Sequence, residues 1–557
     1  MRILKNVMCP NRQQIGLATD IYLPDAEGAY PLVLMRTPYG KSTVTGDLLY
    51  DPTRYTDSGF AVAIQDCRGT GASEGRMDLN GRNDRDDGYD AVEWLAVQPF
   101  CNGRVGMFGL SYFGFTQLAA ASGLPPHLNA ICPFMTCSLH TFGASRMQAL
   151  AGMHLGWAYG QLLEHPEQYM PDDAFRSKML PILQENRVKL DEYARVLPMN
   201  QNPAAMLPGV PLLDNYLELV EGVESKAFWD SIHSPIDYDH VHAAMLHGTG
   251  WMDMARNSTI DNYMAARQSS DALTRSSARL LIGPWTHGSL LPDEVEGEHY
   301  GPNSSGVGQD VVGMMIRWFN LHLKDMADDC FPGRVRYFVM GANEWHTAAD
   351  WPPPESVPTR YYLTAGHALQ TTLPEAGQLP LVYDPADPAP STVIGPDGHM
   401  LTADWSAVSS RADVLEFQTA PLETPLTLAG VIRVTLHAAA DVPDTDFSCR
   451  LTDVAPDGSQ RQLTSGLVRA RHRNGMFRSD FLTPGETVCY EFGIGHAAYQ
   501  FQPGHRIGIQ LAGSDFPASN RNLNTTEPPA LGSTWAVAHD QIFCGGSTAS
   551  YIELPIL

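Results

Sequence analysis

Val105-Gly-Met-Phe-Gly-Leu-Ser111-Tyr-Phe-Gly114 is the stretch that decides the fold. The apolar run Val105–Phe108 predicts a buried strand, and the small-residue run Phe113–Ala121 predicts a helix. Ser111 lies in the turn between them, with glycines on both sides. A strand, a tight turn holding a serine, and a helix together form a nucleophile elbow. Backbone N–H groups at the helix start would face negative charge that develops on a substrate.

The motif departs from the usual Gly-x-Ser-x-Gly pattern. Phe113 stands where the second glycine is expected, and Gly114 follows one position later. A glycine turn with an inert serine is therefore the alternative, and the strand and helix on either side of Ser111 argue against it.

Other apolar runs around this motif alternate with helical patterns. Tyr30–Met35 and Phe60–Gln65 predict buried strands, and Asp87–Leu95 predicts a helix. Strand-like runs return at Ala243–His247 and Ala278–Ile282. Alternating strands and helices predict an α/β fold with a mostly parallel sheet.

A catalytic serine needs a base, and the base needs an acid to orient it. In this fold the chain order is serine, acid, histidine. Asp253 follows the predicted strand at 243–247, and His287 follows the strand at 278–282. Both would then lie at the same edge of the sheet as Ser111.

Two further parts differ in character from this α/β region. Between residues 139 and 238 strand patterns vanish and helical stretches such as Ala174–Leu190 and Asp214–Val220 take over. After the proline-rich joint Trp351–Pro354, short strands and turn signals predominate. The expected division is an α/β-hydrolase core at 1–138 and 239–350, a helical cap at 139–238, and an antiparallel β-sandwich or jelly roll at 351–557.

Composition narrows the class of protein. The chain has 557 residues, 43% of them hydrophobic and 18% charged, with a formal net charge of −25. This charge argues against nucleic acid and anionic membrane surfaces as partners. No run of about 18 apolar residues predicts a membrane span. Nine scattered cysteines without metal spacing favour reduced thiols, a cytoplasmic location and no metal site.

Ordered motifs along nearly the whole chain resemble the family of cocaine esterases, α-amino-acid ester hydrolases and X-Pro dipeptidyl-peptidases. The matching motifs are Leu17–Pro24, Arg36–Lys41, Gln65–Gly75, Gly103–Tyr112, the segments around Asp253 and His287, Asp444–Phe447, Asp453, Pro503–Ile507 and Ser514–Pro517. The resemblance implies an α/β-hydrolase core, a helical cap and a C-terminal jelly roll.

The resemblance also implies residue roles. Ser111 would be the nucleophile, Asp253 the acid and His287 the base. The Tyr39 hydroxyl and the backbone N–H of Tyr112 would form the oxyanion hole. Tyr39 follows the strand at 30–35, where this fold recruits its second oxyanion donor.

Aromatic residues near these positions are the candidates for substrate binding. Trp251 and Trp285 adjoin the acid and the base, and either pocket lining or core packing would explain them. Trp157 in the cap is a further candidate. Met252 stands where relatives usually have an aromatic residue, which leaves the acyl preference open.

The expected reaction is hydrolysis of a small carboxylic ester through an acyl-enzyme, without a cofactor. An X-Pro dipeptidyl-peptidase or an amino-acid ester or amide hydrolase is the alternative, and Glu164, Asp172 and Asp173 are candidates to hold a substrate ammonium. A non-catalytic carbohydrate-binding protein is the remote alternative. The sequence leaves the oligomeric state open, a homo-oligomer included.

Overall fold

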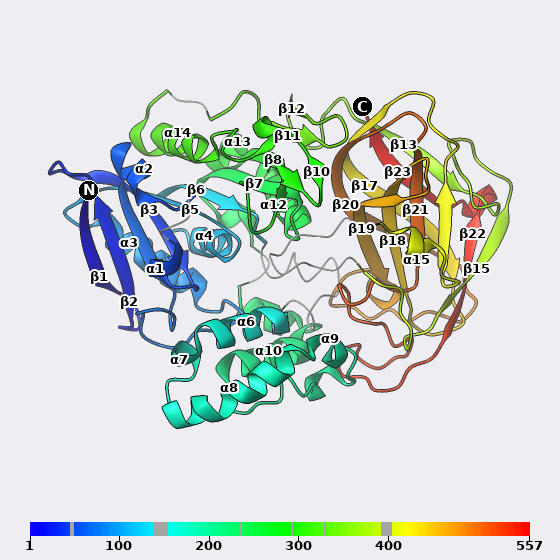
Figure 1. The fold of residues 1–557 in the computed structure, drawn as a ribbon, viewed down its shortest axis with the longest axis horizontal. Helices are drawn as coiled ribbons and strands as arrows, with labels where there is room; N and C mark the ends of the chain where they lie inside the picture. The colour runs from blue at the N-terminus through cyan, green and yellow to red at the C-terminus, as the bar shows by residue number, and fades with distance from the viewer. Residues whose placement is uncertain (45–48, 138–153, 234–235, 292, 328–329, 392–403) are drawn as a thin grey trace.

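The computed structural model describes the chain outside residues 45–48, 138–153, 234–235, 292, 328–329 and 392–403. Figure 1 shows a sheet with helices on both faces, a helical segment beside it, and a β-rich region that contains the C-terminus. Among the described residues, no helix combines the length and the apolar character needed to cross a bilayer.

A ten-stranded sheet forms the N-terminal part, in the order β1-β2-β4-β3-β5-β6-β7-β8-β11-β12. The strands from β4 to β11 in this order are parallel, whereas β1, β2 and β12 pair in antiparallel fashion at the two ends. The strands are β1 (Arg2–Pro10), β2 (Gly16–Leu23), β3 (Tyr30–Thr37), β4 (Ala61–Asp66), β5 (Cys101–Leu110), β6 (Leu128–Phe134), β7 (Ala244–Met252), β8 (Arg279–Thr286), β11 (Val335–Val339) and β12 (Glu344–Ala348).

The central strands are the apolar runs that the sequence predicts, because a parallel strand covered on both faces is buried along its whole length. Every residue of β2, β4 and β7 is buried. The predicted strands were too short at their carboxyl ends. β7 and β8 run on to Met252 and Thr286, so the residues that follow them begin the loops of the candidate site.

Helices cover both faces of this sheet. On one face, α3, α4 and α12 bury small and aliphatic side chains such as Ala91, Leu118 and Ile260 against the strands. On the other face, α2 and α14 bury aromatic side chains such as Tyr55 and Trp318. The helices are α1 (Lys41–Val44), α2 (Pro52–Asp57), α3 (Asp84–Ala96), α4 (Tyr112–Ser122), α12 (Arg256–Gln268), α13 (Ala272–Ser277) and α14 (Val311–Lys324).

A helical segment lies between β6 and β7 in the chain. Its predicted start at 139 and the residues up to 153 lie outside the described residues. The long helix expected to reach Leu190 ends at Arg187, and a separate short helix begins at Leu190. The helices are α6 (Leu155–Glu164), α7 (Pro166–Tyr169), α8 (Asp173–Arg187), α9 (Leu190–Tyr193), α10 (Pro211–Gly222) and α11 (Lys226–Ser231).

This segment packs on both other parts of the chain. Its apolar cluster includes Met77 and Leu79 from the loop before α3, and Phe516 and Ala530 from the C-terminal part. The backbone N–H of Met199 also donates to the carbonyl of Ala530 at 2.9 Å. In Figure 1 the segment accordingly lies against the sheet and the β-rich region together.

Two further sheets make up the C-terminal part. β17 is the long central strand of the larger sheet, in the order β14-β13-β23-β17-β22-β15 with β20 also on β17, and the smaller sheet has the order β16-β21-β18-β19. The strands are β13 (Val357–Leu363), β14 (Leu369–Gln370), β15 (Gly377–Tyr383), β16 (Val414–Gln418), β17 (Leu426–Ala439), β18 (Asp446–Val454), β19 (Gln460–Arg469), β20 (Val488–Phe501), β21 (Arg506–Ala512), β22 (Ala538–Cys544) and β23 (Tyr551–Ile556).

Candidate active site

Ser111 lies at the sharp turn from β5 into α4. Its backbone has φ 59° and ψ −125°, a conformation that residues with a Cβ rarely adopt. Such strain costs about 1–3 kcal/mol and persists where the surrounding structure holds it, typically at functional sites. The turn exposes the serine side chain at the carboxyl end of a central strand.

The two glycines of the motif allow this turn to pack closely. Gly109 has φ +132°, and a Cβ there would lie 2.5 Å from the Phe113 Cβ. A Cβ on Gly114 would lie 2.6 Å from the Cβ of Thr136. Packing therefore explains why the second glycine stands one position later than in the usual motif. Gly114 lies against the end of β6, whereas Phe113 packs over Gly109.

Ser111, His287 and Asp253 form a continuous hydrogen-bonded chain. Ser111 Oγ lies 2.8 Å from His287 Nε2, and His287 Nδ1 lies 2.7 Å from Asp253 Oδ1. The Asp253 side chain is fully buried, and that of His287 is 12% exposed. A buried carboxylate on Nδ1 favours the tautomer whose Nε2 can accept the serine proton.

Pairing of β7 with β8 brings the acid and the histidine together. Met252 is opposite Thr286 in this parallel pair, and Asp253 and His287 are the residues that follow each. The register shifts between Gly250 and Met252. The strands are so close there that a Cβ on Gly250 would lie 2.1 Å from the Trp285 carbonyl oxygen, so this position requires glycine. β5, which leads to Ser111, is separated from β7 by one strand.

Two further groups orient Asp253, and sequence reasoning missed both. Thr249 Oγ1 donates to Asp253 Oδ2 at 2.7 Å, and the Ala255 backbone N–H donates to Oδ1 at 2.8 Å. Thr249 is a buried residue within β7. Its spacing of four residues from Asp253 is a weak signal, since the contact depends on the turn at the end of the strand.

Tyr39 and the start of α4 flank Ser111. Tyr39 lies two residues beyond β3, and burial raises the pKa of its hydroxyl, which keeps the phenol protonated and able to donate. Tyr112 is the first residue of α4, so its backbone N–H has no partner within the helix. The structure thus brings both predicted oxyanion donors to the same strand edge as Ser111.

Family models match the two halves of the chain. The model described as X-Pro dipeptidyl-peptidase (S15 family) matches residues 14–289, which include Tyr39, Ser111, Asp253 and His287. The model described as X-Pro dipeptidyl-peptidase C-terminal non-catalytic domain matches residues 332–553. Cocaine esterase of a Rhodococcus species is 32% identical over 589 aligned residues, covering 100% of this chain and 98% of that protein. The chain belongs to the S15 peptidase and cocaine esterase family.

Membership of this family makes the protein a serine hydrolase, with an S15-type α/β-hydrolase domain followed by a β-rich domain. It also leaves the non-catalytic alternative without support. Solved structures show the same fold. An aminopeptidase from a marine sediment Thaumarchaeota archaeon has a TM-score of 0.78 at 24% identity, and an α-amino acid ester hydrolase has a TM-score of 0.75 at 24% identity. Each comparison covers 100% of this chain and 96% of the other.

The tryptophans near Asp253 and His287 in the sequence lie in the core. Trp251 is 2% exposed and donates its indole N–H to the Phe338 carbonyl at 2.6 Å. Trp285 is fully buried and donates to the Ser304 carbonyl at 2.8 Å. Met252 is 1% exposed. The structure therefore favours core packing over substrate contact for these three residues.

Trp157 differs from those three residues. It is half-buried on α6, and its ring stacks on Tyr112 with a centroid distance of 6.0 Å and an interplanar angle of 7°. Its indole N–H donates to the Tyr39 hydroxyl at 3.2 Å. The structure thus places Trp157 against both predicted oxyanion residues.

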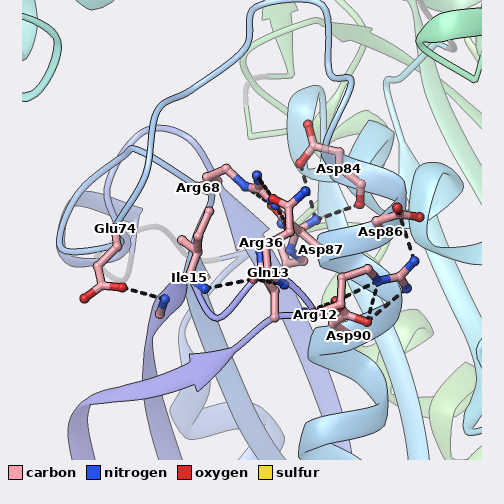
Figure 2. A network of polar contacts seen from close by, with 12 residues as sticks. Arg12, Gln13, Ile15, Arg36, Arg68, Glu74, Asp84, Asp86, Asp87 and Asp90 are labelled. Carbon is pink, nitrogen blue, oxygen red and sulfur yellow. Dashed lines mark hydrogen bonds and ion pairs between the residues drawn. The ribbon is translucent and has the colours of Figure 1, made fainter.

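A cluster of aspartates in the first two turns of α3 pairs with arginines. Figure 2 shows Arg68 on Asp87, and Arg12 bridging Asp86 and Asp90, around the start of α3. Asp86 and Asp87 lie in the first turn of the helix, where its dipole favours negative charge. Among the described residues, no group of three or more histidine, cysteine or acidic side chains is arranged to hold a metal ion.

Proposed function

We propose that this serine hydrolase cleaves carboxylic esters through an acyl-enzyme on Ser111. The observation that supports it most is the chain of short contacts from Ser111 Oγ through His287 to the buried Asp253. The 32% identical relative, which this chain matches end to end, is an esterase. This similarity favours an ester as the substrate.

In the proposed reaction, Ser111 Oγ attacks the ester carbonyl while His287 Nε2 takes the serine proton. The Asp253 carboxylate stabilises the imidazolium that results. Oxyanion charge is stabilised by the Tyr39 hydroxyl and the Tyr112 N–H. His287 then protonates the leaving alcohol, and water repeats the same steps on the acyl-enzyme.

We further propose that the helical segment acts as a cap over this site and that the C-terminal part is a jelly roll, with the domain limits given by the sequence. Trp157 supports the cap assignment, since α6 brings its ring to the oxyanion residues. We also propose a cytoplasmic location, since the nine cysteines of the sequence are scattered and lack metal-ligand spacing.

One observation favours an amino-acid ester or peptide substrate as the second candidate. Glu164 is exposed at the end of α6, seven residues after Trp157 and so on the same helix face. Burial is the main cause of the raised pKa of Tyr39, and the negative charge of Glu164 makes only a small contribution to it. Asp172 instead caps α8, and Asp173 pairs with Arg176. Of these three carboxylates, Glu164 is therefore the one best placed to attract a substrate ammonium.

A paired substrate screen tests the proposal. p-Nitrophenyl esters of increasing acyl length would be assayed beside X-Pro p-nitroanilides and an α-amino-acid p-nitrophenyl ester, with Ser111→Ala as the control for background hydrolysis. Ser111-dependent turnover of plain esters is expected. Turnover confined to the anilides or to the amino-acid ester would replace the first candidate with the second.

A further inference from the structure

We propose that Trp157 is a positioning residue, which holds the Tyr39 hydroxyl so that its proton points to the developing oxyanion. This inference rests on the proposed function, in which Tyr39 supplies one oxyanion donor. It assigns Trp157 a role in the chemical step that differs from lining an acyl pocket.

The contact between the two side chains is direct. Trp157 Nε1 lies 3.2 Å from the Tyr39 hydroxyl oxygen. The two rings also meet edge to face, with centroids 6.3 Å apart and planes inclined by 69°. Tyr39 also packs edge to face on Phe113, a residue of α4, with ring centroids 5.3 Å apart. The Tyr39 ring is thus held between the nucleophile helix and the helical segment.

The chemistry of the two groups fixes the direction of the hydrogen bond. An indole N–H can only donate, whereas a phenol oxygen both donates and accepts. Trp157 must therefore donate and Tyr39 accept, which leaves the Tyr39 proton free for another partner. A phenol that accepts a hydrogen bond also becomes a better donor, since such bonds strengthen one another.

Trp157 is itself held in place from its other side. Its ring lies flat on Tyr112, whose hydroxyl donates to Asp84 Oδ2 at 2.7 Å. Asp84 pairs with the fully buried Arg36 at 3.3 Å, a contact visible at the start of α3 in Figure 2.

Arg36 lies in β3, three residues before Tyr39. The contacts therefore form a closed loop that begins and ends on the β3 segment. This loop contains both proposed oxyanion residues, so Trp157 links the donor on Tyr39 to the donor at the start of α4.

The two roles for Trp157 predict different kinetics. A ring that only contacts the acyl group stabilises ground state and transition state alike, so its loss would raise KM. A residue that orients an oxyanion donor acts when charge develops, so its loss would lower kcat. If Trp157 positions Tyr39, the effect of replacing Trp157 depends on the Tyr39 hydroxyl. If Trp157 only lines a pocket, that effect does not depend on Tyr39.

A double-mutant cycle with p-nitrophenyl acetate separates these roles. Trp157→Phe keeps an aromatic ring on Tyr112 and removes the N–H. We expect it to lower kcat about 5–10-fold, the effect of one hydrogen bond, with a smaller change in KM. In a Tyr39→Phe background the same substitution should change kcat less than about twofold, because the group it positions is gone.

Two controls guard against an indirect effect. Tyr159→Phe removes one polar atom from the same helix, where Tyr159 donates to the Ala204 carbonyl at 2.7 Å, and should leave kcat unchanged. If Trp157→Phe folds poorly, replacement of Trp157 by β-(3-benzothienyl)alanine removes the N–H with the ring size kept, and the same loss in kcat is expected.

Equal losses in both backgrounds, a loss confined to KM, or no loss from either Trp157 replacement would overturn the inference. A failure of the proposed function would give different results. Full turnover by Tyr39→Phe would remove Tyr39 from the oxyanion hole, and turnover by Ser111→Ala would remove the acyl-enzyme itself.

Discussion

Thr249 Oγ1 donates a hydrogen bond of 2.7 Å to Asp253 Oδ2, the carboxylate oxygen that does not contact His287. Because Asp253 is fully buried, this bond replaces water on that oxygen. The threonine thereby helps to keep the carboxylate aimed at the imidazole.

Thr249→Val should therefore lower kcat about tenfold, the cost of one hydrogen bond to a buried charge. Thr249→Ser keeps the hydroxyl and should retain most of the activity. Steady-state kinetics on one ester, with circular dichroism to check folding, measures the difference. Equal activity in the valine and serine variants would show that the Asp253 orientation does not depend on this bond.

Tyr39→Phe should lower kcat about 10²–10³-fold, the usual loss for one oxyanion donor. KM should change much less, since the ground-state carbonyl carries little charge. Tyr55→Phe is a suitable control, because Tyr55 is a buried tyrosine on α2 and its hydroxyl contacts the Met315 sulfur. A Tyr39→Phe variant within about threefold of wild type would mean that another group donates to the oxyanion.

Glu164→Gln tests the amino-acid substrate. For an α-amino-acid ester we expect kcat/KM to fall up to about fivefold, since an exposed ion pair contributes up to about 1 kcal/mol. The matching acyl ester without the amine should be unaffected. Glu167→Gln makes the same charge change three residues further along, at an exposed position, and should alter neither substrate. Equal effects of Glu164→Gln on both esters would argue against recognition of an ammonium.

Asp540 on β22 should make stability depend on pH. Burial raises the pKa of this carboxyl to about 8, helped by the negative charge of Asp441. In an unfolded chain an aspartate has a pKa of about 3.9, so the folded protein holds an extra proton between these values and loses stability as pH rises through this range.

Asp540→Asn removes this titration with little change in shape. Its melting temperature should therefore exceed that of wild type by an amount that grows from about pH 5 to about pH 8 and then levels off. Thermal unfolding followed by circular dichroism at several pH values measures this gap. A gap that is constant with pH would show that Asp540 is ionised in the folded protein at every pH tested.

The positions of Ser111, Asp253 and His287 could be predicted because each follows an apolar strand directly. Parallel strands end at one edge of a sheet, so residues that follow them gather there. The pairing of Met252 with Thr286 shows how close this rule brings the acid and the histidine. The role of Tyr39 came from resemblance to a family, since one tyrosine after a strand has no distinctive pattern of its own.

Contacts made by the helical segment could not be predicted. Trp157 reaches Tyr39 across 118 positions, through a helical segment whose placement depends on tertiary packing. Trp251 and Trp285 lie close to catalytic candidates in sequence, yet their side chains are buried in the core, because helices cover both faces of the sheet that these strands belong to. Neighbourhood in sequence was thus a poor guide to which aromatic side chains lie at the candidate site.

The most direct test of the account is the site of covalent labelling by a fluorophosphonate, which reacts with an activated serine. Intact-protein mass spectrometry should show one adduct on wild type, and peptide mapping should place it on Ser111. Ser111→Ala should not be labelled, while its circular dichroism matches wild type. Labelling of Asp253→Asn should be much slower, because His287 would adopt the wrong tautomer. An adduct on another residue, or equal labelling of Ser111→Ala, would contradict the assignment of Ser111 as nucleophile.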